Sequence, residues 1–375
     1  MKKTVLALAA IAASSAAFAQ SSVTLYGVVD ASVESVKGNT GATVSGKSTT
    51  FNRVSSGNLA TSRLGFKGVE DLGGGLKAKF QLEATVNADT GASASGRFFD
   101  RAAWLGLASA EAGELRIGRQ DSLIGAQIAD AIGAQAYDAS VVAATLGGVT
   151  YRRIDNALTY IAPTFVPGLT LSAQYSTATD GSATNNAELT NGSKLGRAYG
   201  FAANFVQGPL SAGASYINVN SNQTLQQEHV GLFAYGAYDL GVAKLTAFYN
   251  DDTNDGNRAV NGNRLYGFNA AVPVVTGLTI TGGYAYAKNA TGYVLNSAGT
   301  SVTSAAFGAK GTKHDNAGII TLKAQYDLSK RTAVYALFTE VQNGDKARLA
   351  ITAATSPTAN DKSSRGLAVG VRHAF

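Results

Sequence analysis

Three arginines stand where strand-like segments meet long connections, and their guanidinium groups could act together on anions. Arg63 begins one such segment, Arg101 nearly begins another and Arg153 directly precedes a third. Because these segments belong to five consecutive predicted strands, the three side chains are expected to share one sector of a sheet. A guanidinium keeps its positive charge in proteins and offers several N–H donors, so a group of them favours anions. Arg116 and Lys67 lie on the polar faces of their segments and are further candidates.

The side chains on which most catalytic and metal sites depend are scarce. The only histidines are His229, His314 and His373, and the sequence has no cysteine. One histidine lies in the last predicted strand and the others near long connections, so neither a Ser-His-Asp arrangement nor a histidine metal cluster is supported. We therefore expect no catalytic residue, no bound metal and no cofactor.

The N-terminus has the pattern of a secretory signal. Lys2 and Lys3 precede an apolar run over residues 5–13, and Ala17 and Ala19 frame a small-x-small cleavage site. The alternative is a membrane anchor, but the run is short and no stop-transfer pattern follows it. The sequence predicts a signal peptide over residues 1–19 and one exported domain over residues 20–375.

The exported part has the composition of an all-β chain. Gly, Tyr and Phe occur 43, 16 and 15 times against 5 prolines, and helix signals are few. No stretch after the signal approaches the roughly 18 consecutive apolar residues that a spanning helix needs. Removing the two N-terminal lysines lowers the formal charge from +6 to +4, which does not imply a nucleic-acid partner.

Period-two alternation of apolar and polar residues predicts sixteen strands. Seven tight turns and eight long polar loops alternate strictly between them. The predicted strands cover residues 22–34, 62–70, 76–86, 99–109, 113–119, 154–162, 169–177, 197–206, 210–218, 229–239, 242–250, 264–272, 278–288, 315–327, 331–341 and 365–375.

The two faces of the predicted strands differ in polarity. In residues 76–84 the apolar face carries Leu76, Ala78, Phe80, Leu82 and Ala84, and the polar face carries Lys77, Lys79, Gln81 and Glu83. Sixteen strands enclose a lumen too wide for side chains of this size to fill, so the polar face is expected to line water and the apolar face to meet lipid. The sequence therefore predicts a sixteen-stranded antiparallel transmembrane β-barrel. Aromatic residues near strand ends are expected to form girdles at the two membrane interfaces: Tyr160, Phe165, Phe205, Tyr235, Tyr238, Phe248, Tyr249, Tyr326, Tyr335 and Phe338.

Several motifs resemble the trimeric general porins of β-proteobacteria, of the neisserial, Burkholderia and Comamonas type. They are "SSVTLYGVVDASVE", "TSRLGFKGVEDLGGGLKAKFQLE", "RAAWLGLASAEAGELRIGRQ", "NALTYIAP" and the terminal "VGVRHAF". The resemblance covers the chain from the signal onward. It implies a homotrimer in the outer membrane of a Gram-negative bacterium, with the third loop folded into the lumen. It also implies that the C-terminal strand is read by the barrel-assembly machinery through Leu367, Val369, Val371, His373 and Phe375.

The third long connection, from Gln120 to about Arg153, is expected to narrow the lumen. Its apolar character suits a segment that packs inside the barrel better than a loop facing lipopolysaccharide. By the resemblance, Arg63, Arg101 and Arg153 match pore-lining arginines of the family. Loop 3 would present an acidic side to them through Asp121, Asp130 and Asp138, giving a transverse field across the pore.

The resulting functional prediction is a general diffusion porin for inorganic anions and small hydrophilic solutes. Its other expected partners are outer-membrane lipid and lipopolysaccharide, whose phosphates are the alternative ligands for any single arginine. The parity of Arg119 points to lipid, and the sequence leaves open whether this side chain turns inward or extends to the membrane interface. The alternative functions are an outer-membrane barrel enzyme, such as a protease or phospholipase, and a structural or adhesive barrel.

Overall fold

The computed structural model describes most of the chain from residue 22 onward. The expected signal peptide, Asp138 and His314 lie outside the described residues. The described ranges are 22–39, 48–93, 97–132, 152–177, 197–222, 227–254, 264–288, 294–295, 301–302, 316–344, 351 and 363–375.

Seventeen strands form one closed antiparallel sheet, and all sixteen predicted strands are present in it. They are β1 Ser22–Asn39, β2 Ser48–Ser56, β3 Arg63–Gly73, β4 Leu76–Thr85, β5 Ala102–Ser109, β6 Gly113–Asp121, β7 Arg153–Ile161, β8 Leu169–Ser176, β9 Ala198–Gln207, β10 Leu210–Asn222, β11 Gln227–Asp239, β12 Lys244–Asn254, β13 Arg264–Val275, β14 Leu278–Lys288, β17 Ala317–Asp327, β18 Thr332–Asn343 and β19 Ser364–Ala374. A separate small hairpin joins β15 Val294–Leu295 to β16 Ser301–Val302.

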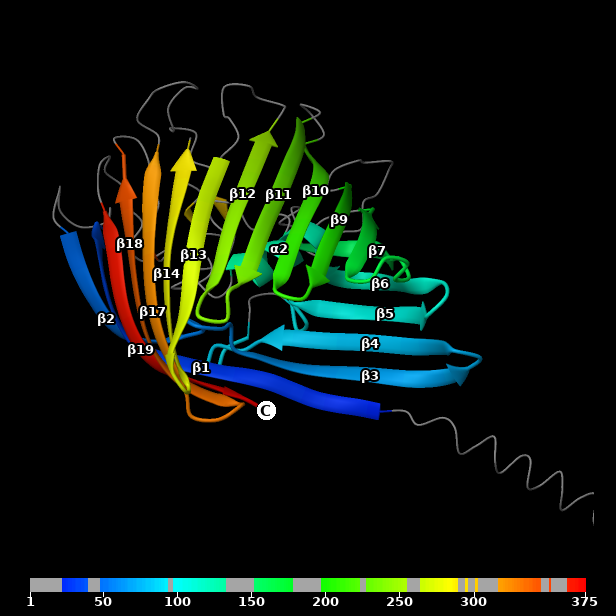
Figure 1. Ribbon diagram of the computed structural model, residues 1–375, viewed down its shortest axis with the longest axis horizontal. Coiled ribbons are helices and arrows are strands. Elements are labelled where there is room, and N and C mark those ends of the chain that lie inside the picture. The colour runs from blue at the N-terminus through cyan, green and yellow to red at the C-terminus, as the bar shows by residue number, and fades with distance from the viewer. Residues whose placement is uncertain are drawn as a thin grey trace, which may run out of the picture.

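The barrel closes through β1. One edge of this strand pairs with β3 over Ser22–Val28, and the other edge pairs with β19 over Val28–Lys37. Figure 1 shows the strands curving around a central space, with the tight turns and the C-terminus at one end and the strand ends that precede or follow the long connections at the other. The predicted separation of turns and loops is confirmed.

The first long loop was predicted to run from residue 35 to residue 61, and this is wrong. β1 continues to Asn39, and the added strand β2 pairs with its extension. The β-branched and aromatic residues of "STTFNRVSS" favour a strand, and Val54 lies opposite Val33 on the outer face. The barrel wall is therefore taller at β1 and β2 than the sequence pattern indicates.

The outer face of the barrel is apolar and exposed. Exposed fractions reach 67% at Val23, 64% at Val33, 63% at Leu105 and 62% at Ile117. An apolar surface that continues around the wall is not stable in water, so it identifies the part of the barrel that contacts lipid. Within the described ranges, no helix is long and apolar enough to cross a membrane.

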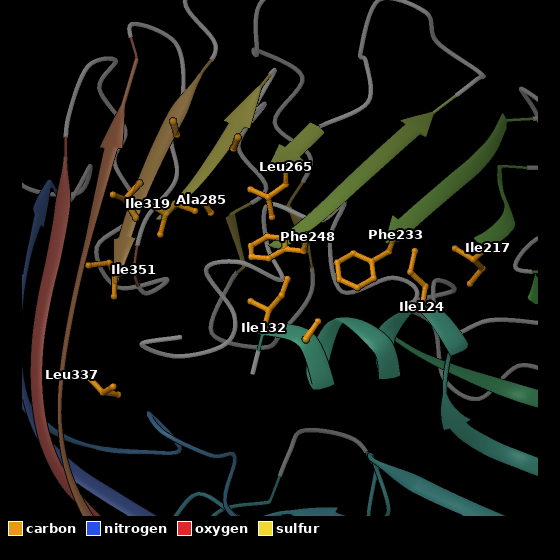
Figure 2. Close-up of a cluster of buried hydrophobic side chains, with 14 of the residues drawn as sticks. Ile124, Ile132, Ile217, Phe233, Phe248, Leu265, Ala285, Ile319, Leu337 and Ile351 are labelled. Carbon is orange, nitrogen blue, oxygen red and sulfur yellow. The ribbon is translucent and has the colours of Figure 1, made fainter. Parts of the chain in front are cut away.

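Part of the inner face is apolar too, which corrects the expectation that it only lines water. Phe233, Phe248 and Leu265 are buried inside the barrel (Figure 2). They belong to a cluster of buried apolar side chains that continues toward β18 and includes residues of a helix inside the barrel. Tyr235 and Tyr335 also belong to this inner face, so these two tyrosines and Phe248 are not part of an interfacial girdle. These residues were predicted to lie in the girdle because they lie near turns in the sequence. The face of the sheet on which a side chain lies is instead decided by its odd or even position along the strand.

The last strand alternates as predicted. Leu367, Val369 and Val371 are exposed on the outer face, with Ala368 and Gly370 buried between them. Phe375 extends this pairing beyond β19, because its amide donates to the Gly27 carbonyl at 3.1 Å and its carbonyl accepts from the Gly27 amide at 3.2 Å. A side chain at position 27 would overlap the Phe375 ring, so the ring lies over the glycine at the seam of the barrel.

Candidate constriction of the barrel

A helix follows β6 and lies inside the barrel. α2 spans Leu123–Ile132, and Ser122 caps its first turn by accepting a hydrogen bond on Oγ from the Gly125 amide at 3.0 Å. Position 125 requires glycine because a Cβ there would lie 2.5 Å from the Arg152 carbonyl oxygen. The predicted inward fold of the third loop is confirmed by this helix, while residues 133–151 lie outside the described ranges.

The helix is fixed to the wall formed by β8–β11 (Figure 1). Gln127 Nε2 donates to the Ala203 carbonyl at 2.9 Å and to Asn204 Oδ1 at 2.8 Å. On the same side of the helix, Ile124 and Ile132 are buried in the apolar cluster of the inner wall (Figure 2). α2 therefore occupies one side of the lumen and narrows the space that remains.

Glu83 on β4 holds two of the three predicted arginines. Arg101 Nε lies 2.5 Å from Glu83 Oε1, and Arg63 Nε lies 3.8 Å from Glu83 Oε2. The Tyr26 hydroxyl donates to the same carboxylate at 2.7 Å and accepts from Gln81 Nε2 at 2.6 Å. One carboxylate thus orients two guanidinium groups against the wall and leaves the trio with a net positive charge.

Arg153, at the start of β7, completes the predicted trio. Arg101 is close enough to interact electrostatically with both Arg63 and Arg153. Arg153 Nε lies 3.1 Å from Asp121 Oδ1 in an ion pair without the alignment of a hydrogen bond. The structure therefore brings the three arginines into one sector of the wall, and their effect on ion passage stays a prediction.

Arg119 takes an orientation that the sequence had left open. The pairing of β6 with β7 shifts register between Gly118 and Gln120, and Asn156 has a positive φ of 50° at this bulge. Arg119 Nη1 lies 2.5 Å from Asp155 Oδ1, its Nε donates to the Asp100 carbonyl at 2.6 Å, and its side chain is only 12% exposed. It does not extend toward a membrane interface.

Arg97 pairs with the other oxygen of Asp155, from Nη1 to Oδ2 at 2.6 Å. We call Arg63, Arg97, Arg101, Arg119 and Arg153 the basic wall. In the described ion pairs these five arginines meet three carboxylates, Glu83, Asp121 and Asp155. Asp100 is a fourth carboxylate near enough to interact with Arg153, so five arginines still exceed the carboxylates of this sector, although no guanidinium in it lacks a carboxylate.

The other predicted cations lie farther along the strands. Arg116 is held by Glu114 at 2.5 Å and stacks over the Trp104 ring at 4.5 Å, and Lys79 reaches the same Glu114 at 2.8 Å. Lys67 Nζ lies 5.2 Å from the centre of the Tyr26 ring. All three cations contact side chains of the wall, and Glu114 offsets part of the charge of Arg116 and Lys79.

The predicted acidic side of loop 3 has a different arrangement. Asp121 ends β6 and pairs with Arg153, so it belongs to the basic wall and does not face that wall from across the pore. Asp130 is exposed on α2 within the barrel. Loss of water around this carboxyl, and then the charge of Asp121, raise the pKa of Asp130 above its ordinary value. In the described part of loop 3, Asp130 is the residue that fits the predicted acidic side.

Comparison with known proteins identifies the family to which this barrel belongs. The sequence profile of the Gram-negative porins matches residues 5–346. The chain belongs to this family of porins. Outer membrane porin protein 32 of Delftia acidovorans is 32% identical over 394 residues, and an outer membrane porin protein of Bordetella pertussis is 30% identical over 410 residues; both alignments cover 100% of each chain. The anion-selective porin from Comamonas acidovorans superposes with a TM-score of 0.72 at 26% identity, covering 95% of this chain and 100% of that one.

The porin therefore resides in the outer membrane of a Gram-negative bacterium, where its barrel forms a channel for small solutes. Sequence reasoning missed several residues of its lumen. Glu83 has the parity of the polar face, but the pattern did not show that two arginines would share it. Arg372 of the porin lies on the inner face of β19, opposite Asp30 in register, and is near enough to interact with Arg63. The alternation along "GLAVGVRHAF" places Arg372 on the inner face, but the sequence prediction considered only the residues of the outer face.

No group of three or more histidine, aspartate and glutamate side chains in the described parts of the porin could hold a metal ion. The polar side chains of the lumen instead form ion pairs and hydrogen bonds with one another. This arrangement suits a passage that offers weak contacts to many solutes rather than one tight site.

Proposed function

We propose that this porin is a general diffusion channel with a moderate preference for anions. The observation that carries the proposal is the charge balance of the basic wall, in which five arginines meet three carboxylates. Paired carboxylates weaken the positive field but do not cancel it, so we expect preference for anions without exclusion of cations. The likeness to an anion-selective porin supports the same sign.

The test is a zero-current potential across a planar bilayer that separates two concentrations of potassium chloride. Insertion of purified protein should give stepwise conductance, and the potential should have the sign of chloride preference. A cation-selective wild type would contradict the proposed selectivity. The same preparation is assayed with peptide and phospholipid substrates, since turnover would support the enzyme alternative and absence of both currents and turnover would support a structural barrel.

We also propose the partners that fit this function. The protein is expected to assemble as a homotrimer, with its apolar outer face against lipid and its long loops toward lipopolysaccharide. Phe375 and the outward residues of β19 are proposed to be read by the barrel-assembly machinery. No bound cofactor, metal or nucleic acid is required for passive diffusion of inorganic anions and small hydrophilic solutes.

Export should remove residues 1–19, because Ala17 and Ala19 frame the cleavage site that best follows the apolar run. We expect the intact mass of protein from outer membranes to correspond to a chain that begins at Gln20. The N-terminal peptide of the same sample provides an independent check. A mature protein that still carries Lys2 and Lys3 would overturn the signal assignment.

A further inference from the structure

The wall strand that pairs with β1 contains more residues than this pairing requires. Ala31 pairs with Ser56 and Val28 pairs with Arg63, so only two residues of β1 separate these pairs. Six residues, Gly57–Ser62, connect Ser56 to Arg63 on the neighbouring strand. β2 and β3 are therefore two halves of one wall strand, and the surplus residues between them leave the sheet. We call Gly57–Ser62 the inner segment.

The inner segment folds into the barrel and not toward lipid. Asn58 is 4% exposed, and its Nδ2 donates to Ser32 Oγ at 2.8 Å and to Glu34 Oε2 at 2.9 Å. Both acceptors lie on the inward face of β1, where they alternate with the exposed Val33. Leu59 packs against the buried apolar cluster inside the barrel.

Asp30 on β1 fixes the inner segment with its backbone and its carboxylate. Its carbonyl accepts from the Gly57 amide at 3.0 Å, and its Oδ2 accepts from the amides of Leu59 at 2.9 Å and Ala60 at 2.6 Å. The Tyr335 hydroxyl, from β18, donates to Oδ1 of the same carboxylate at 2.5 Å. Asp30 is 0% exposed, so water does not compete for these bonds.

The inner segment also contacts the basic wall directly. Arg63 Nη1 donates to the Thr61 carbonyl at 3.1 Å, which is shorter than the 3.8 Å between Arg63 Nε and Glu83. Ser62 hydroxyl donates to the Asp30 carbonyl at 3.0 Å and so fixes the turn next to Arg63. The direction of the Arg63 guanidinium therefore depends on the inner segment as well as on Glu83.

We propose that the inner segment is a second constriction element, fixed in place by Asp30, and that it positions Arg63 for anion passage. α2 packs on β8–β11, whereas the inner segment is held by β1, β3 and β18, nearly half of the barrel away in strand order. The lumen is then narrowed from two sides by two separate parts of the chain. This inference rests on the proposed function, because it assigns the width and selectivity of that same pore.

The direct test restores one continuous wall strand. Replacing Gly57–Ser62 by a two-residue Thr-Thr link matches the two residues of β1 and keeps the inward parity of Arg63. We expect higher single-channel conductance, passage of larger neutral polyethylene glycols and loss of part of the chloride preference. An assembled variant with wild-type conductance, polymer exclusion and zero-current potential would overturn the proposal. A wild type without channels would instead contradict the proposed function itself.

A second measurement does not depend on folding of the shortened chain. The sequence has no cysteine, so Thr61→Cys provides a single thiol on the inner segment. A negatively charged methanethiosulfonate reagent should modify it and reduce the chloride current, whereas Val33→Cys on the outer face should leave the current unchanged after modification. Tyr335→Phe, compared with Tyr238→Phe on the outer face, should shift the zero-current potential in the direction of the shortened variant. A Thr61→Cys thiol that does not react, or whose full modification leaves the current unchanged, would overturn the inference.

Discussion

Replacing Arg63, Arg101 and Arg153 together by glutamine should remove most of the chloride preference of the channel. One unit charge about 4 Å from a permeating ion contributes roughly 1 to 4 kcal/mol at effective dielectric constants of about 80 to 20, before screening by salt. The triple change removes three of the five guanidinium groups of the basic wall and leaves Glu83, Asp121 and Asp155. The measurement is the zero-current potential in a potassium chloride gradient, which should fall toward zero or change sign.

Two matched variants make this result specific. Glu83→Gln removes the carboxylate between Arg63 and Arg101, so it should move the potential in the opposite direction, toward stronger chloride preference. Arg264 on β13 pairs with Asp251 on β12, far from the basic wall in strand order, and its side chain is 49% exposed. Arg264→Gln should therefore leave the potential close to that of the wild type. An unchanged potential in the triple variant would contradict the role of the basic wall.

Sixteen of the seventeen barrel strands, and the tight turns, were predictable because each depends on local sequence, whereas β2 was not predicted. Alternation in "GLKAKFQLEATV" places Lys79 and Glu83 on one face and Phe80 and Leu82 on the other, and the structure keeps this parity in β4. The tight turns also followed from local chemistry, as at Gly73–Gly75, where three successive glycines have positive φ. Closure of the barrel then followed from the number of strands and from their unlike faces.

The contents of the lumen could not be predicted in the same way. Which carboxylate meets Arg63, Arg101 or Arg119 depends on contacts between strands that are distant in sequence, and alternation gives the face of a residue without its partner. The bulge at Asn156 also breaks the parity on which the orientation of Arg119 was judged. The inner segment was hidden because its small and polar residues have the composition of an ordinary surface loop.

The sequence pattern that ends at Phe375 fits two roles, barrel packing and recognition during assembly. Deleting Phe375 removes two backbone hydrogen bonds with Gly27, each worth about 1 kcal/mol, and the contact of a ring that is 43% exposed. A loss of roughly this size is small beside the paired backbone of seventeen strands. If the ring served packing alone, the deletion would lower stability slightly and leave most of the protein assembled.

We expect deletion of Phe375 to reduce trimers in the outer membrane to a small fraction of the wild-type yield, while the molecules that do assemble conduct normally. The measurements are the amount of heat-modifiable trimer in outer membranes and the single-channel conductance of that material. Refolding into detergent, without the assembly machinery, should proceed nearly as well as for the wild type. Gly27→Val is the matched variant, since its side chain overlaps both the Phe375 ring and the Arg63 carbonyl of β3, so it disturbs the seam but leaves the terminal residue in place. In the proposed assembly, recognition of Phe375 precedes closure of the barrel, so Gly27→Val should retain more outer-membrane trimer than the deletion. Normal trimer yield after the deletion, or an equal loss in both variants, would show that seam packing and not recognition explains the terminal phenylalanine.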